Sequence, residues 1–130
     1  MKDKKFPLKN RSTLELNITE MKLKDIIEKL KLRVICGEEY LENEITGGYC
    51  SDLLSDVMGN AQEGHVWITI QVHKNIIAVA SLKELSAIML VKGLMPTEET
   101  IVTAKEQGVA IVQTSETAFE IAGKLYNLIR

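Results

Sequence analysis

Apolar side chains recur with a helical period just after residue 20. The segment MKLKDIIEKLK covers residues 21–31, and its apolar positions are Leu23, Ile26, Ile27 and Leu30. Spacings of three and four residues place such positions on one side of a helix. The segment therefore predicts an amphipathic helix. The β-branched run at residues 33–36 predicts a short strand that ends at Gly37.

Residues 66–72, VWITIQV, alternate with the period of a strand, whose successive side chains leave opposite faces. One face holds Val66, Ile68, Ile70 and Val72. The other face holds Trp67, Thr69 and Gln71. We therefore predict a strand with one apolar face and one polar, functional face on which Trp67 is half-buried.

The second half of the chain continues the alternation of helix and strand. Asn75 predicts the cap of a helix over residues 76–85, and the apolar run at residues 87–91 predicts a buried strand. A further helix is predicted to begin at Thr97, which follows a proline, and to end at Gly108.

The last two elements are a strand over residues 109–112 and a helix over residues 115–130, capped by Thr114 or Ser115. Strands that alternate with helices are typical of a largely parallel sheet covered by helices. We find no internal repeat or low-complexity tract. The pattern predicts one α/β domain over residues 21–130.

Composition is that of an ordinary soluble domain and gives no indication of nucleic acid or membrane as a partner. The 130 residues are 45% hydrophobic and 26% charged, with a net charge of −2. No apolar segment reaches the roughly 18 residues that a spanning helix needs, so we predict a cytoplasmic protein. The excess of Lys and Arg lies in residues 1–34, and we interpret residues 1–20 as a flexible basic leader or an upstream extension.

The two cysteines, Cys36 and Cys50, lack a CxxC spacing and have no base or orienting acid nearby in the sequence. Idle thiols are the interpretation that we favour over a disulfide, a zinc site or a nucleophile. His65 follows Glu63-Gly64 and is interpreted as a turn residue.

The stretch TGGYCSDLLSDVMGNA, residues 46–61, has two interpretations. Asp52 and Asp56 are four residues apart, which on a helix brings both carboxylates to one face where they can share a cation. Alternatively, Ser51 caps the helix and both carboxylates are solvated, while the opposite face is core. We favour the structural interpretation, in which the core face holds Leu53, Leu54, Val57 and Met58.

The same stretch opens with Thr46-Gly47-Gly48. A glycine pair permits a tight turn with positive φ, or a concavity of backbone amides that holds an anion. Both interpretations stay open, and we include Thr46, Gly47 and Gly48 among the candidate ligand residues as a loop that closes over the site.

The principal candidate ligand residues end the strand at residues 66–72. Thr69, Gln71, His73 and Asn75 lead from the strand's carboxyl end into a helix, with Lys74 between them. Ligands of open α/β sheets bind at such an edge, and free amides at a helix start attract phosphate or carboxylate. The alternative is that these groups serve only packing and capping. Ser115 ends the last strand and is predicted to reach the same edge.

Several motifs occur together and in one order. The run ITGGYCSDLLSDVMGNAQEGHVWITIQVHKNIIAVASL is followed by AIMLVKG, EETIVTAKEQGVAIV and TAFEIAGKLY. Through these elements residues 21–130 resemble the DRTGG domain family. The resemblance implies a three-layer α/β/α fold similar to the amino-terminal domain of HPr kinase. The chain departs from the family at the eponymous Asp-Arg, where Glu42 and Asn43 stand, so no role that needs the arginine is carried over.

The resemblance implies regulation rather than catalysis. Such domains occur between paired CBS domains in inorganic pyrophosphatases that respond to adenine nucleotides, and within some phosphotransacetylase chains. The chain has no G-x-x-x-x-G-K-[ST] element, so kinase activity does not accompany the fold. We expect a non-catalytic regulatory module without a cofactor. It senses a small anionic ligand, with an adenine nucleotide as one candidate, or mediates dimerisation.

The final helix has a broad apolar arc that is widened by Phe119 and Tyr126, which predicts a homodimer or another protein partner. Two alternative functions remain. One is a scaffold that binds no metabolite and acts through an unidentified protein partner. The other is a magnesium-dependent enzyme of phosphoryl chemistry that uses Asp52, Asp56 and His73.

Overall fold

The computed structural model describes residues 21–130, and the predicted leader at residues 1–20 lies outside the described residues. The helices are α2 (Leu23–Leu30), α3 (Leu54–Asn60), α4 (Asn75–Leu82), α5 (Glu98–Gln107) and α6 (Ala118–Ile129), with a 3-10 turn η1 (Glu38–Tyr40). The strands are β1 (Arg33–Cys36), β2 (Gly47–Cys50), β3 (His65–Thr69), β4 (Ala87–Leu90) and β5 (Ile111–Gln113).

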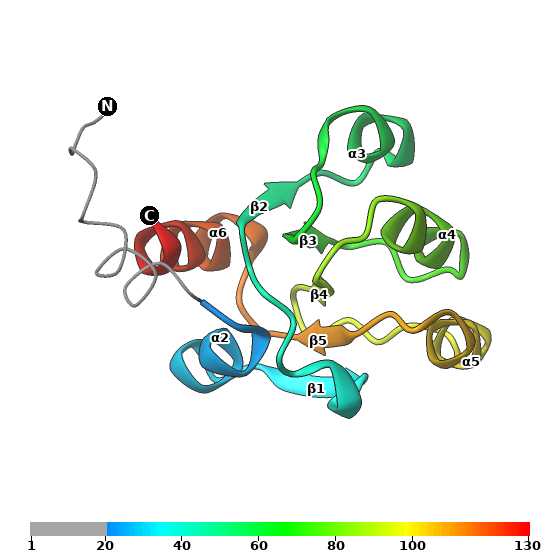
Figure 1. The fold of residues 1–130 in the computed structure, drawn as a ribbon, viewed down its shortest axis with the longest axis horizontal. Helices are drawn as coiled ribbons and strands as arrows, with labels where there is room; N and C mark the ends of the chain where they lie inside the picture. The colour runs from blue at the N-terminus through cyan, green and yellow to red at the C-terminus, as the bar shows by residue number, and fades with distance from the viewer. Residues whose placement is uncertain (1–20) are drawn as a thin grey trace, which may run out of the picture.

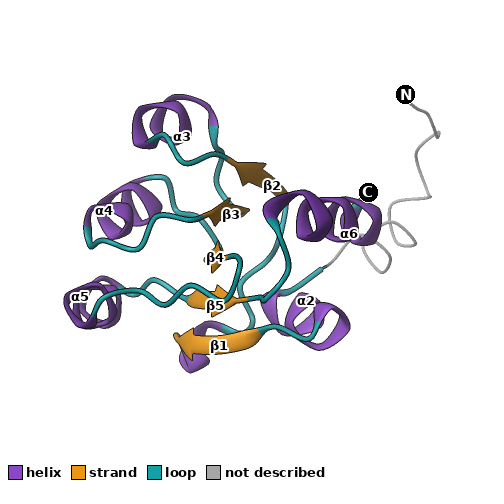
Figure 2. Ribbon diagram, turned by 180° about the vertical axis from the view of Figure 1, so that it is seen from behind, coloured by secondary structure: helices purple, strands orange, loops and turns teal. Residues whose placement is uncertain are grey.

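Across residues 21–130, the strands form one five-stranded sheet in the order β1-β5-β4-β3-β2. Strands β2 to β5 run parallel, and β1 pairs antiparallel with β5. Helices α3, α4 and α5 cover one face, and α2 and α6 cover the other (Figure 1 and Figure 2). The predicted three-layer α/β/α fold with a largely parallel sheet is confirmed.

The central strands are buried on both faces. Their alternating side chains divide into two clusters, because each face meets its own layer of helices. Trp67 and Ile88 pack on the side of α3, α4 and α5, whereas Val66 and Met89 pack on the side of α2 and α6. The predicted polar face at residues 66–72 is therefore wrong. Trp67 is 0% exposed rather than half-buried, and its indole nitrogen donates to the carbonyl of Ser51 at 2.8 Å.

Strand β3 is also shorter than predicted. It ends at Thr69, and the following Ile70 is 45% exposed instead of continuing the apolar face. The Ile70 amide donates to Asp52 Oδ1 at 2.9 Å. A side chain from the loop after β2 therefore accepts the hydrogen bond that a neighbouring strand would accept if β3 continued. His65, interpreted above as a turn residue, is the first residue of β3.

Strand β2 was not predicted, because its Gly-Gly pair indicated a turn. Neither glycine has positive φ, so the expected turn or amide concavity is wrong. Both lie in a strand that pairs with β3 along residues 65–68. A Cβ on Gly48 would lie 3.1 Å from Leu125 Cδ2, and one on Gly47 would lie 3.0 Å from His65 Nε2. The pair therefore gives room for α6 and for His65 to approach the strand.

Three helix starts also differ from expectation. Helix α3 begins at Leu54, and the Ser51 hydroxyl accepts from the Leu53 amide without capping a helix. Asn75 lies inside α4, whose cap position Lys74 makes no side-chain cap bond. Helix α6 is capped by Thr117, which accepts from the Glu120 amide, and not by Thr114 or Ser115.

The two ends of α5 agree with the sequence. The Thr97 side chain accepts from the amide of Thr100, and Gly108 ends the helix in the left-handed conformation. None of the helices described for residues 21–130 combines the length and apolar character that crossing a bilayer requires.

Gly37 joins β1 to η1 with a φ of +99°, and a Cβ there would lie 2.6 Å from Ala110 Cα. We expect Gly37→Ala to lower the free energy of unfolding by about 3 kcal/mol, because left-handed strain adds to a backbone clash. Urea denaturation of the variant measures this loss.

Gly59→Ala is the matched control, because Gly59 lies in α3 and a Cβ there meets nothing within 4 Å. It should raise the free energy of unfolding by up to about 1 kcal/mol, since alanine is the better helix former. Equal losses for the two variants would contradict the steric explanation.

Candidate functional site

The carboxyl ends of β2 to β5 share one edge of the sheet, which we call the carboxyl edge. Because β1 runs antiparallel to β5, its first residue, Arg33, lies at this edge opposite Gln113. The loops that follow the parallel strands also begin here. Ligands of α/β sheets bind at such an edge, so the predicted ligand residues are located relative to it.

Asp52, Thr69 and Gln71 form one hydrogen-bonded network at this edge. The Thr69 hydroxyl donates to Asp52 Oδ1 at 2.8 Å, and the Gln71 amide donates to the Thr69 hydroxyl at 3.1 Å. The Gln71 side chain donates to the Asp52 carbonyl at 2.8 Å. Through these hydrogen bonds the Thr69 hydroxyl links the loop after β2 to the loop after β3. Thr69 is only 1% exposed, so the link is shielded from water.

Asp56 belongs to a different network. It accepts from the Tyr49 hydroxyl at 2.8 Å and from Asn60 Nδ2 at 2.9 Å. The Tyr49 hydroxyl holds the pKa of Asp56 below its usual value, and Asp56 raises the pKa of Tyr49. Asp52 precedes α3, so the helical spacing expected for a shared cation does not exist. Among residues 21–130 no group of three or more His, Cys, Asp or Glu could hold a metal ion.

His73, Lys74 and Asn75 are exposed and lie where α4 begins. Lys74 Nζ pairs with Glu99 Oε2 at 2.9 Å, which raises the pKa of Lys74. Lys74 and Asn75 line a hollow of about 620 Å³ between α4 and α5. The amide of Ile77 already donates to the Lys74 carbonyl at 3.0 Å, so this helix start differs from the free-amide anion site that we predicted.

Thr46 and Gly47 lie at the opposite edge of the sheet, because Gly47 pairs with His65 at the amino end of β3. A strand of four residues separates them from the carboxyl edge by about 13 Å. The Thr46 hydroxyl donates to the Glu63 carbonyl at 2.7 Å. The prediction that this segment closes over Thr69 is therefore wrong.

The amino edge has a hollow of about 440 Å³ with an acidic lining. Glu44, Glu63 and Glu84 contribute to it, and such a lining repels an anion. Nearby, burial lowers the pKa of His65, whose Nδ1 accepts from the amide of Gln62 at 3.2 Å.

A third hollow, of about 390 Å³, lies at the carboxyl edge and is strongly basic; we call it the basic hollow. It is lined by Lys29, Leu30, Lys31, Arg33, Gln113, Thr114, Ser115, Glu116 and Lys124. The end of α2, the start of β1 and the loop between β5 and α6 meet there. Ser115 is the one predicted ligand residue that lines it.

Three of the four cations that line the basic hollow have no ion-pair partner within residues 21–130. Glu116 Oε2 pairs with Lys124 Nζ at 2.7 Å, which neutralises the one carboxylate of the lining. Within residues 21–130, Lys29, Lys31 and Arg33 make no ion pair. Three like charges that share a small concave surface repel one another and attract an anion.

The cations of the basic hollow were not predicted as ligand residues. Their sequence signal is the alternation KLKLR at residues 29–33, which we had counted only as part of the basic amino-terminal third. The reason lies in the pairing of β1. Antiparallel pairing with β5 brings Arg33 to Gln113, and no local pattern in the sequence specifies that partner.

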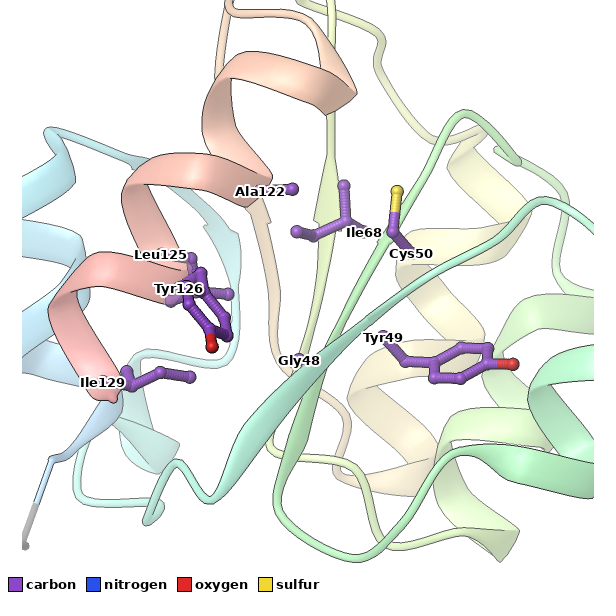
Figure 3. Close-up of a pocket in the computed structure, with 8 residues that line it drawn as sticks. All are labelled: Gly48, Tyr49, Cys50, Ile68, Ala122, Leu125, Tyr126 and Ile129. Atoms are coloured by element: carbon purple, nitrogen blue, oxygen red, sulfur yellow. The ribbon is translucent and has the colours of Figure 1, made fainter. Parts of the chain in front are cut away.

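An apolar hollow of about 170 Å³ lies between β2 and α6. In Figure 3, Ala122, Leu125, Tyr126 and Ile129 extend from α6 beside β2, while the Tyr49 ring points away from α6. Cys50 also lines this hollow and is an exposed, free cysteine. Partial burial of its sulfur and the nearby charge of Asp52 raise the pKa of the thiol. On α6, Phe119 is 90% and Tyr126 is 66% exposed.

Comparison with known proteins supports the fold. No family model and no curated protein matches the chain. The solved structures that are similar include the CBS and DRTGG domains of the regulatory region of Clostridium perfringens pyrophosphatase, complexed with the activator diadenosine tetraphosphate. The TM-score is 0.62 at 19% identity, with 91% of this chain and 50% of that chain covered. The chain thus spans half the length of that regulatory region, and at this identity the likeness shows the fold.

Asp52→Ala should lower the free energy of unfolding by about 1–2 kcal/mol, because the buried Thr69 hydroxyl loses its acceptor. Asp52→Asn keeps an oxygen acceptor and should lose less than half of that amount. Urea denaturation of both variants measures the difference. Equal losses would contradict the assignment of Asp52 as the acceptor that joins the two loops.

Proposed function

We propose that this chain is a non-catalytic regulatory module of the DRTGG type that binds a small anionic ligand in the basic hollow. The observation that carries the proposal is a set of three cations, Lys29, Lys31 and Arg33, which form no ion pair within residues 21–130 and surround a hollow of about 390 Å³. That volume is in the range of small-molecule sites. The placement at the carboxyl edge agrees with where α/β sheets bind ligands.

Two further observations support a sensing role over a catalytic one. One of the similar solved structures is a regulatory region in complex with an activator that carries phosphates. The carboxylates of the alternative phosphoryl-transfer enzyme, Asp52 and Asp56, belong to separate networks. We also propose that residues 21–130 form one domain and that its likeness to the HPr kinase amino-terminal domain extends to the arrangement of the layers.

Binding of inorganic triphosphate should raise the melting temperature, because a ligand of the folded state stabilises it by about 2.7 kcal/mol at 100 times Kd. Arg33→Gln should weaken this effect without lowering the ligand-free melting temperature, since Arg33 has no ion-pair partner among the described residues. Differential scanning fluorimetry over a series of triphosphate concentrations measures both quantities.

Lys105→Gln is the control for a general loss of positive charge. Lys105 is exposed near the end of α5 and does not line the basic hollow. The proposal fails if no concentration of triphosphate shifts the melting temperature, or if Lys105→Gln weakens the shift as much as Arg33→Gln does.

A second function, dimerisation, is favoured by the exposed aromatic side chains on α6. Phe119 and Tyr126 lie on the helix that also borders the apolar hollow beside the edge strand β2. We propose that a second copy of the chain covers this surface. Aromatic side chains are enriched in protein interfaces, and an uncovered edge strand is a ready place for another chain to pack.

Light scattering should then give a dimer mass for the wild-type chain. The double variant Phe119→Lys and Tyr126→Lys should give a monomer mass. Val102→Lys is the control, because Val102 is 55% exposed on α5, away from this surface. A monomer mass for the wild type at high micromolar concentration would contradict the dimer.

A further inference from the structure

Strand β2 forms the outer edge of the sheet beside α6. Within residues 21–130 it pairs with β3 on one side, and no described strand lies on its other side. Gly48 and Cys50 are exposed in this strand. An exposed edge strand leaves backbone amides and carbonyls without partners, and natural proteins commonly blunt or cover such an edge.

The apolar hollow between β2 and α6 lies at the same edge. Its volume is about 170 Å³, and the described residues that line it include no charged side chain. Figure 3 shows Ala122, Tyr126 and Ile129 extending from α6 beside β2. Small-molecule sites are usually larger, roughly 300–1,000 Å³. The hollow therefore suits one or two aliphatic side chains of a polypeptide better than a metabolite.

The described part of the chain begins directly beside this edge. The Ile45 amide donates to the Met21 carbonyl at 2.7 Å, and Lys22 forms an antiparallel bridge with Glu44. Met21 packs against the same apolar cluster as Ile129 of the hollow. An antiparallel course that continues from Met21 toward lower residue numbers follows β2 along its length.

The sequence before Met21 alternates between apolar and polar positions. Residues 14–18 read Leu-Glu-Leu-Asn-Ile, which is the period of a strand with one apolar face. All five Lys and Arg of residues 1–20 lie in residues 1–11, so the alternating segment carries none of the basic charge. Its composition suits an apolar surface.

The lengths of the two segments also agree. Ile18 is three residues before Met21, and Gly48 is three residues after Ile45. Three extended residues span about 10 Å, so an antiparallel chain brings Ile18 level with Gly48. Two residues further along, Leu16 comes level with Cys50.

We propose that residues 14–18 of the same chain lie antiparallel along β2 as a sixth strand, with Leu16 and Ile18 in the apolar hollow against α6. Addition of an extended segment to an exposed sheet edge, with pockets for its alternate side chains, is a common mode of peptide recognition. Glu15 and Asn17 then face away from α6, because successive side chains of a strand leave opposite faces.

The basic hollow takes no part in this contact. The added strand becomes the edge of the sheet, and the second copy proposed above packs on Phe119 and on the exposed side of Tyr126. Dimerisation and addition of the strand are therefore separate events that separate measurements detect.

Disulfide trapping tests the contact, because Cys50 is exposed whereas Cys36 is buried. In the full chain, Leu16→Cys should form a disulfide with Cys50 when oxidised glutathione is added. The two thiols lose two electrons and two protons, which reduce one oxidised glutathione to two thiols. Mass spectrometry and non-reducing gel electrophoresis should show a single bridged chain that is lighter by two hydrogen atoms.

Asn17→Cys is the matched control for this experiment. It should bridge at least about tenfold more slowly, because Cβ atoms on opposite faces of a strand are farther apart than the ~4.5 Å that a disulfide tolerates. Equal rates in the two variants, or no bridge in Leu16→Cys, would overturn the inference. A bridge between two chains, seen as a band of twice the mass, would place the segment of a second copy on β2 and overturn it as well.

The reactivity of Cys50 gives a second test without a new cysteine. The double variant Leu16→Asp and Ile18→Asp should make Cys50 react severalfold faster with Ellman's reagent, because a carboxylate is costly in an apolar hollow and the cover is lost. Asn17→Asp should leave the rate unchanged. All chains are compared at a concentration where light scattering gives them the same mass. An unchanged rate in the double variant would contradict the added strand while leaving the anion site and the dimer intact.

Discussion

Burial of the sheet on both faces is the constraint on which the rest of the structure depends. Trp67 and Ile88 pack under α4 and its neighbours, while Val66 and Met89 pack under α2 and α6, so no face of the central strands meets water. A polar group in such a strand needs an internal partner, as Thr69 has in Asp52. Surfaces for chemistry are therefore left to the two edges of the sheet and to the outsides of the helices.

The two edges have opposite electrostatic character. Glutamates surround the hollow at the amino edge, and cations surround the hollow at the carboxyl edge. The parallel direction of β2 to β5 collects the loops after these strands at one edge, and antiparallel β1 adds Arg33 to that edge. Had β1 run parallel to β5, Arg33 would lie at the acidic edge. The direction of β1 thus decides which edge of the sheet carries Arg33.

The polar residues that the sequence marked as principal candidates at the end of β3 are engaged in internal hydrogen bonds. Asp52, Thr69 and Gln71 satisfy one another, and this network joins the loops after β2 and β3. The charged side chains of the basic hollow that form no ion pair within residues 21–130 are instead lysines and an arginine that look in the sequence like ordinary surface residues. Lys31 and Arg33 became candidate ligand residues only when the structure placed them in one hollow with Ser115.

Wherever periodicity was strong, the sequence by itself determined the elements. It indicated α2, β4, both ends of α5 and a largely parallel sheet covered by helices, because apolar spacing and caps act within a few residues of the chain. The three-layer arrangement was implied by the family resemblance. Strand β2 was missed, since Gly47-Gly48 carries no strand signal and its need for glycine arises from the approach of Leu125 and His65. Among the predicted ligand residues, Thr46 and Gly47 lie at the amino edge of the sheet, whereas Ser115 lines the basic hollow at the carboxyl edge. Only tertiary structure could decide these placements, because pairing partners such as β1 with β5 are far apart in the sequence and are chosen by packing.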